Sequence, residues 1–358
     1  MSDPKYSLPR DGAPRVGIVM MSALGDAVHV LPVINAIKRW SPGSRITWVL
    51  QHGPASLMRG HPAVDDIVLF DRRGGVRSYL QVRRALAARP FDVVLALQVY
   101  IKAGLVTALT RSPVKLGFDR ARARDLNPLF TTHRIPPHTP QHVQDQYFEF
   151  LQALGVPHDP VRWELGPWEG ERESQRQFYE RLERPAAVLV IGSSVGPREW
   201  LPDRWAAVSD ALYQDFGLHP VLAGGRSERE LHTEGEIMRL GRAPVVSTLG
   251  VPLRELVGII DGAALMISLD TAPLHMAVAL DRPVISLIGH TNPKRTGPYR
   301  RFHDLLIDAY GDPGEDYPIS TERRYGRMER IAARDVLDRV ELWRERYEGR
   351  QPAASTRR

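Results

Sequence analysis

The chain has 358 residues, enough for two domains of common size, and 43% of them are apolar, which supports sizeable cores. It contains no cysteine, which excludes a disulfide framework and a thiolate metal site. The net charge is +6 and is carried almost entirely by arginine, which suits an anionic ligand such as a phosphate. No nucleic-acid-binding motif, signal-peptide core or apolar run of about 20 residues is present, so we expect neither a nucleic-acid partner nor a membrane-spanning helix.

Strands and helices alternate through the first half of the chain. A loose leader is expected at residues 1–14 and a surface loop, rich in His and Pro, at 133–142. Strands are predicted at residues 15–20, 45–50, 66–70 and 92–97, and helices at about 27–37, 54–59, 76–88, 103–110 and 143–154. Because this alternation favours parallel pairing, it predicts a doubly wound sheet.

The same alternation restarts near residue 186. Strands are predicted at residues 186–191, 219–223, 245–248, 264–267 and 284–288, and helices at 171–182, 202–215, 227–240, 253–262, 274–280 and 331–346. The resulting domain organisation is an N-terminal domain at 1–165, a linker region at 166–185, a C-terminal domain at 186–320, a C-terminal helix at 321–348 and a disordered tail at 349–358.

Polar residues follow several of these strands, at the sheet edge where open α/β domains bind ligands. Asp26 and His29 follow the first strand, although a helix cap and a packed histidine fit the local pattern as well. No Gly-x-Gly-x-x-Gly follows that strand, which argues against a nicotinamide cofactor. In the second half, residues 268–275 lead from a strand into a helix with Pro273 in its first turn, where a missing N–H does no harm. Such a helix start either suits a phosphate or is simply a capped helix.

Two arginine-rich stretches lie in the first half. The first contains Arg72, Arg73 and Arg77, and the second contains Arg120, Arg122 and Arg124. Each is either a solvated face or a cradle for phosphates on a substrate, because the arginine fork matches phosphate geometry.

Five motifs then resemble one family. Residues 270–277, Asp-Thr-Ala-Pro-Leu-His-Met-Ala, are similar to D-[TS]-G-P-x-H-x-A, and the strand with its final glycine at 283–289 follows as expected. The turn at 24–32, Arg198 two residues before Trp200, Gly224-Gly225-Arg226-Ser227-Glu228, and residues 115–124 match further motifs. Together they resemble the family 9 glycosyltransferases, which include the ADP-heptose:lipopolysaccharide heptosyltransferases, and most closely the heptosyltransferase I branch.

This resemblance implies the α/β architecture called GT-B, in which two doubly wound Rossmann-like domains face each other across a cleft. It also implies an inverting transferase that uses neither a metal nor a cofactor. Asp26 matches the family's general base, and Arg198 would neutralise the departing diphosphate. The implied donor-binding residues are Ser193, Arg198, Glu228, Val251, Asp270, Thr271, Ala272 and His275. For Asp270 two roles stay open, namely binding sugar hydroxyls and holding the loop.

The resemblance further implies ADP-heptose as donor and an anionic glycolipid, a Kdo residue on lipid A, as acceptor. The implied acceptor-binding residues are Arg72, Arg73, Arg120, Arg122 and Arg124. A basic protein without a membrane span would work in the cytoplasm, peripherally attached to the inner face of the cytoplasmic membrane.

The chain departs from the family pattern at three positions. Ala272 replaces a glycine, Arg198 a lysine and Arg226 a proline. Alanine would be costly if position 272 required a positive φ or a very close approach to phosphate. Alternatives therefore remain: a family 9 transferase with another donor or acceptor, a non-catalytic nucleotide-sugar or glycolipid binding protein, and a sugar-nucleotide epimerase, against which the Gly25-Asp26 turn argues.

Overall fold

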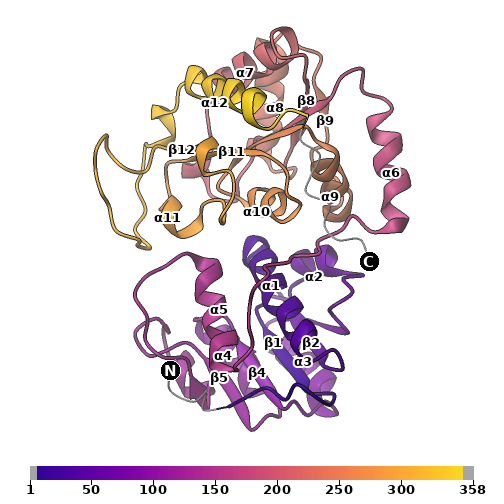
Figure 1. Ribbon diagram of the computed structural model, residues 1–358, viewed down its shortest axis with the longest axis vertical. Coiled ribbons are helices and arrows are strands. Elements are labelled where there is room, and N and C mark those ends of the chain that lie inside the picture. Colours follow the sequence, from indigo (N-terminus) through magenta and orange to yellow (C-terminus); the bar gives the residue numbers. More distant parts are fainter. Residues whose placement is uncertain (1–5, 350–358) are drawn as a thin grey trace. The chain divides into compact units, whose positions relative to one another are not determined.

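The computed structural model describes residues 6–349, and the chain divides into two compact units whose boundary in sequence lies between Leu165 and Gly166. Each unit contains a six-stranded parallel sheet with helices packed around it (Figure 1). The predicted class, α/β with two doubly wound sheets, is therefore confirmed. Residues 350–358 of the predicted tail lie outside the described residues, as do residues 1–5 of the predicted leader.

The first unit has the strand order β3-β2-β1-β4-β5-β6. Its strands are β1 Arg15–Val19, β2 Arg45–Leu50, β3 Asp66–Leu69, β4 Val93–Ala96, β5 Val114–Gly117 and β6 His133–Arg134. Its helices are α1 Leu24–Trp40, α2 His52–Met58, α3 Val76–Ala87, α4 Ile101–Ala108, the 3₁₀ helix η1 Asn127–Phe130, and α5 Val143–Ala153. The strand order reverses between β1 and β4, and sheets of this kind bind ligands beyond the carboxyl ends of the strands at that point.

The second unit repeats this topology, with the strand order β12-β11-β10-β7-β8-β9. Its strands are β7 Ala186–Val190, β8 His219–Ala223, β9 Val246–Ser247, β10 Leu265–Leu269, β11 Val284–Ile288 and β12 Leu306–Asp308. Its α-helices are α6 Glu169–Tyr179, α7 Pro202–Gln214, α8 Glu228–Leu240, α9 Leu253–Gly262, α10 Ala272–Ala279, α11 Pro293–Thr296 and α12 Ala333–Arg346. Short 3₁₀ helices are η2 Gly196–Arg198, η3 His303–Leu305 and η4 Met328–Arg330. Here the strand order reverses between β7 and β10.

Three short strands, β5 and the edge strands β6 and β12, were not predicted. β5 has only four residues and carries Lys115, which interrupts its apolar pattern. β6 consists of two residues inside the segment predicted to be a surface loop, and that prediction was wrong because Leu116 and Gly117 pair with His133 and Arg134. β12 spans three residues and extends the second sheet beyond β11. Such short segments lack the repeated pattern from which a strand can be read.

Part of the predicted loose leader is packed against the first unit. Leu8 is 1% exposed, its N–H donates to the Leu154 carbonyl at 3.1 Å, and its carbonyl accepts from Trp40 Nε1 at 3.0 Å. The prediction was therefore wrong at this residue, because one apolar side chain and two hydrogen bonds fix the segment before β1.

Helix α6, which lies within the predicted linker region, packs on α9 of the second unit. Gln175 Nε2 donates to the Gly258 carbonyl at 2.9 Å, and Arg172 Nη1 donates to Asp261 Oδ2 at 2.6 Å. Within residues 6–349, no helix is long and apolar enough to cross a membrane.

Replacing Leu8 by alanine tests the packing of the segment before β1. We expect Leu8→Ala to lower the free energy of unfolding of the first unit by about 2–4 kcal/mol, because the substitution leaves a cavity in a buried site. Chemical denaturation measures this change, with Ser7→Ala, at an exposed neighbour, as the control. Equal stabilities of the two variants would contradict the packing described here.

Candidate active site

Asp26 lies in the first turn of α1, directly beyond the carboxyl end of β1. Its Oδ2 accepts from the Ala23 N–H at 3.1 Å, and its Oδ1 accepts from Tyr147 Oη at 3.2 Å. Tyr147 is buried on α5, which packs along α1. The carboxylate is therefore held from both sides at a partly exposed position, and the helix start favours its negative charge.

His29 lies one turn further along α1 but is buried. Its Nδ1 lies 3.0 Å from Gln144 Oε1, and Gln144 Nε2 donates to the His29 carbonyl at 2.8 Å. This pair joins α1 to α5, so His29 supports the helix that carries Asp26.

Gln98, on the loop after β4, fixes the loop that precedes Asp26. Its Oε1 accepts from the Met21 N–H at 2.9 Å, and its Nε2 donates to the Ser22 carbonyl. Asn127 Nδ2 in turn donates to the Gln98 carbonyl at 3.2 Å. The two loops on either side of the reversal in strand order are thus joined by side-chain hydrogen bonds.

Four of the five arginines predicted to bind an acceptor are exposed on loops at the carboxyl edge of the first sheet. Arg72 and Arg73 follow β3 and line an open cavity of about 840 Å³ together with residues 51–53 after β2. Arg120 and Arg124 follow β5. Within the described part of the chain none of these four side chains forms an ion pair, so their charge is available to an anion.

Arg122 is held differently from its two neighbours. Its guanidinium donates to both carboxylate oxygens of the buried Glu149 at 2.6 Å and also to Asp119. Burial opposes the charge, but the hydrogen bonds with Glu149 and Asp119 outweigh it and raise the pKa of Arg122 above its usual value. Arg122 therefore organises the loop after β5, and its fork is occupied within the protein.

In the second unit, Asp270 joins three loops at the carboxyl edge of the sheet. It directly follows β10 and is 4% exposed. Arg198, after β7, donates from Nη1 to the Asp270 carbonyl at 2.8 Å, and its Nη2 lies 3.5 Å from Oδ2. Thr291, after β11, donates its hydroxyl to Oδ2, and Thr296 Oγ1 lies 3.5 Å from the same atom. These contacts join the loop after β10 to the loops after β7 and β11.

The loop after Asp270 leads directly into α10. Thr271 is the extended N-cap residue, Ala272 is the first helical residue, and His275 is buried in the first turn. Among the described non-glycine residues, positive φ occurs at Asp125, Glu164, Asp281, Arg300 and Phe302 and not at Ala272. Alanine in place of the family glycine therefore costs no backbone strain.

The remaining predicted donor residues lie on neighbouring loops of the same edge. Ser193, after β7, is buried, and its carbonyl accepts from Arg229 Nη2 at 3.4 Å. Glu228 is exposed at the start of α8. Val251 follows β9, where the Gly250 N–H donates to the Gly224 carbonyl at 3.0 Å and so ties the loops after β8 and β9 together.

Glu230, rather than Glu228, shapes the glycine loop after β8. Its carboxylate accepts from the Gly225 N–H at 2.6 Å and from the Ser227 hydroxyl at 2.6 Å. Burial would raise the pKa of Glu230, but the Ser227 and Gly225 hydrogen bonds outweigh it and lower the pKa. Burial raises the pKa of the neighbouring Glu199, although the Arg229 guanidinium lies 3.4 Å away.

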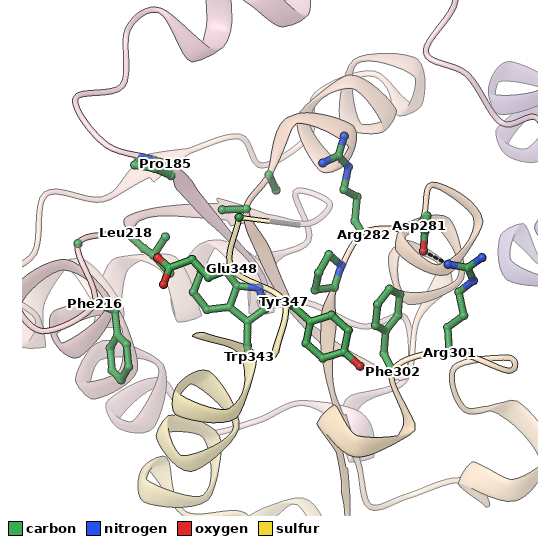
Figure 2. A pocket seen from close by; sticks show the side chains of 15 residues that line it. Pro185, Phe216, Leu218, Asp281, Arg282, Arg301, Phe302, Trp343, Tyr347 and Glu348 are labelled. Carbon is green, nitrogen blue, oxygen red and sulfur yellow. Dashed lines mark hydrogen bonds and ion pairs between the residues drawn. The ribbon is translucent and has the colours of Figure 1, made fainter. Parts of the chain in front are cut away.

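A separate cavity of about 580 Å³ lies at the opposite edge of the second sheet. Pro185, Ala264 and Pro283, which directly precede β7, β10 and β11, line it. Figure 2 shows Trp343 and Tyr347 from the end of α12 in this cavity. None of the predicted site residues lines it. Within residues 6–349, no group of three His, Asp or Glu side chains is arranged to hold a metal ion.

Sequence reasoning missed Tyr147, Gln98, Thr291 and Glu230. Tyr147 contacts a residue 121 positions away, so no local signal announces it. Thr291 could have been expected among residues beyond the carboxyl end of β11, and Glu230 from the Ser-x-x-Glu capping box at Ser227.

The family model, the relatives in sequence and the similar solved structure all point to heptosyltransferases. The family described as Glycosyltransferase family 9 (heptosyltransferase) matches residues 79–311. The lipopolysaccharide core heptosyltransferase OpsX of Haemophilus influenzae is 26% identical over 85% of this chain and 89% of its own length. Lipopolysaccharide heptosyltransferase 1 of Salmonella typhimurium is 28% identical over 80% of this chain and 91% of its own. The structure of the E. coli heptosyltransferase WaaC with ADP superimposes with a TM-score of 0.72 and 25% identity, covering 92% of this chain and 99% of that one.

The two doubly wound sheets, with polar loops gathered at their carboxyl edges, define a GT-B glycosyltransferase fold. The chain belongs to glycosyltransferase family 9 (heptosyltransferase). It is accordingly an enzyme, a glycosyltransferase, as the motifs indicated.

The different environments of Arg122 and Arg120 predict different effects of truncation. Arg122→Ala leaves two buried carboxylates without their counter-ion, which we expect to cost about 3–5 kcal/mol of unfolding free energy. Arg120→Ala removes an exposed charge and should change stability by less than about 0.5 kcal/mol. Denaturation of the two variants checks this, and equal stabilities would refute the structural role of Arg122.

Restoring the family glycine tests the role of position 272. Because Ala272 has helical backbone geometry, Ala272→Gly should lower stability by less than about 1 kcal/mol and leave nucleotide affinity unchanged. Titration with ADP measures the affinity. A tenfold gain in affinity would mean that the alanine methyl group obstructs the ligand.

Proposed function

We propose that the enzyme transfers heptose from ADP-heptose to a Kdo residue of the lipopolysaccharide inner core, with inversion of the anomeric centre. Asp26 is the general base and no metal ion takes part. The observation that carries the proposal is the placement of Asp26 beyond β1, oriented by Tyr147 at 3.2 Å, in a family 9 fold. The names of the relatives support the sugar and the acceptor class, and the ADP in the similar E. coli structure supports the nucleotide.

In this mechanism the acceptor oxygen attacks the anomeric carbon while the bond from that carbon to the diphosphate oxygen breaks. The acceptor hydroxyl loses its proton to the Asp26 carboxylate, and ADP leaves with the bonding electrons. Tyr147 acts as a positioning residue, because its hydroxyl donates to Oδ1 and so fixes the orientation of the carboxylate.

Departure of ADP requires groups that stabilise the growing charge on its β-phosphate. The start of α10 offers its first N–H groups and the Thr271 hydroxyl, and the helix dipole adds a favourable field. The Arg198 guanidinium lies next to the start of α10, where it donates to the Asp270 carbonyl at 2.8 Å. His275, Ser193, Glu228 and Val251 complete the proposed donor site, with Glu228 assigned to a ribose hydroxyl.

The acceptor is proposed to be an anionic glycolipid. Arg72, Arg73, Arg120 and Arg124 are exposed at the carboxyl edge of the first sheet, the same edge at which Asp26 lies. They would bind phosphate and carboxylate groups of the acceptor, while Arg122 keeps the loop after β5 in shape. The enzyme would work in the cytoplasm, attached peripherally to the inner face of the cytoplasmic membrane.

Removing the proposed base tests the mechanism. We expect Asp26→Ala to lower kcat by roughly 10²–10⁴-fold, the usual contribution of a positioned acid or base, while ADP affinity stays unchanged. A transfer assay with ADP-heptose measures kcat, and titration with ADP measures the affinity.

Asp203→Ala is the matched control, because Asp203 is an exposed acidic residue in the first turn of α7. It should transfer heptose like the wild type. Near wild-type transfer by Asp26→Ala would show that the base assignment is wrong.

A thermal-shift screen with ADP-, UDP- and GDP-sugars tests the donor. Free ADP-heptose at about 100 times its Kd should stabilise the domain that binds it by about 2.7 kcal/mol, which is readily seen as a higher Tm. Stabilisation by a UDP-sugar, with none by ADP or ADP-heptose, would rule out the proposed donor.

A further inference from the structure

The first unit carries an exposed apolar surface for which the reaction gives no use. Tyr100, Leu126 and Leu129 are 54%, 57% and 72% exposed. Tyr100 is the N-cap residue of α4, and the two leucines belong to the segment that forms η1. Single exposed leucines are ordinary on protein surfaces, whereas exposed apolar side chains gathered on one rigid element indicate an interaction site.

Hydrogen bonds join these two segments into one surface. The Arg124 N–H donates to the Val99 carbonyl at 3.0 Å, and Asn127 Nδ2 donates to the Tyr100 carbonyl at 3.0 Å. The buried Asn127 therefore places Leu126 beside the start of α4. Gly104 lets η1 lie against α4, because a Cβ at that position would come within 2.4 Å of the Phe130 ring.

Basic side chains accompany the apolar ones. Lys102 on α4 and Arg120 and Arg124 on the loop before η1 are exposed, and within residues 6–349 none of the three forms an ion pair. The nearby carboxylate of Asp125 accepts from the Ile101 N–H at 3.4 Å. Nearby Asp119 is buried and paired with Arg122. Three exposed cations therefore stand against the one exposed carboxylate of Asp125, so the net charge of this surface is positive.

We propose that this surface, made of Tyr100, Lys102, Arg120, Arg124, Leu126 and Leu129, docks on a membrane that contains acidic phospholipids. Exposed apolar side chains together with exposed cations fit the boundary between acidic headgroups and acyl chains, where each basic residue adds electrostatic attraction. Arg120 and Arg124 follow β5, so docking here presents a membrane-borne acceptor to the carboxyl edge of the sheet that carries Asp26. The inference rests on the proposed function, because an acceptor anchored in lipid is what gives the docking its use.

Vesicle binding by the full-length protein tests the proposal. Wild type should co-sediment with phosphatidylcholine–phosphatidylglycerol vesicles at least roughly tenfold more tightly than with phosphatidylcholine alone. Leu126→Ser/Leu129→Ser should weaken binding to the mixed vesicles roughly tenfold or more, through loss of buried apolar surface. Lys102→Glu should weaken it roughly fivefold or more and reduce its salt dependence.

Two controls match these variants in the second unit. Met238→Ser/Leu240→Ser removes exposed apolar side chains from α8, and Arg181→Glu reverses an exposed charge. Both should bind vesicles like the wild type. All variants should keep the wild-type Tm, because every substituted side chain is exposed.

A transfer assay with an acyl-free Kdo oligosaccharide separates this proposal from the proposed function. The leucine double variant and Lys102→Glu should turn over that acceptor at the wild-type rate.

The docking surface would be overturned, even with normal transfer, if the wild type does not bind acidic vesicles or if the leucine double variant binds them as tightly as the wild type. Self-association that the double variant abolishes, without vesicle binding, would assign the surface to a second copy and equally overturn the proposal. Failure of wild type to transfer heptose at all, with vesicle binding intact, would refute the function and leave the surface standing.

Discussion

The contacts of the buried Asp270 carboxylate hold together the loops at the carboxyl edge of the second sheet. A carboxylate that is 4% exposed is costly unless charged or hydrogen-bonding groups surround it. Arg198, Thr291 and Thr296 meet this need from two other loops, and in doing so they fix the loops after β7, β10 and β11 against one another. The start of α10 and the Arg198 guanidinium are thereby placed together before any ligand arrives. A preformed arrangement of this kind avoids paying for reorganisation during the reaction.

In the first unit, neutral side chains fix the loops at the carboxyl edge of the sheet. The amide of Gln98 joins the loops after β1 and β4, Asn127 holds the backbone of Gln98, and Tyr147 contacts Asp26 directly. Neutral partners suit the proposed role of Asp26, because a cation paired with the carboxylate would make it a weaker proton acceptor. The other predicted arginines are exposed on loops after β3 and β5, whereas Arg122 is paired with the buried carboxylates of Glu149 and Asp119.

The sequence was informative wherever a strong local pattern coincided with a general rule of the fold. Long apolar strands revealed both sheets, and residues beyond their carboxyl ends included Asp26 and Asp270. Contacts between residues distant in the chain could not be predicted from the sequence, since nothing near Tyr147 indicates its contact with Asp26. Arg122 was indistinguishable from Arg120 and Arg124, because only the burial of Glu149 separates them. The short strands β5, β6 and β12 depend on pairing with neighbours, so their own residues carry little signal.

The stereochemistry of transfer tests the central claim most directly, because a single displacement assisted by Asp26 has only one stereochemical outcome. Nuclear magnetic resonance of the enzymatic product, compared with the ADP-heptose supplied, reports the anomeric configuration of the transferred heptose. The account predicts a configuration opposite to that of the donor, formed without a heptosyl-enzyme intermediate. Retention of the donor's configuration would exclude a single in-line displacement and would contradict the role assigned to Asp26.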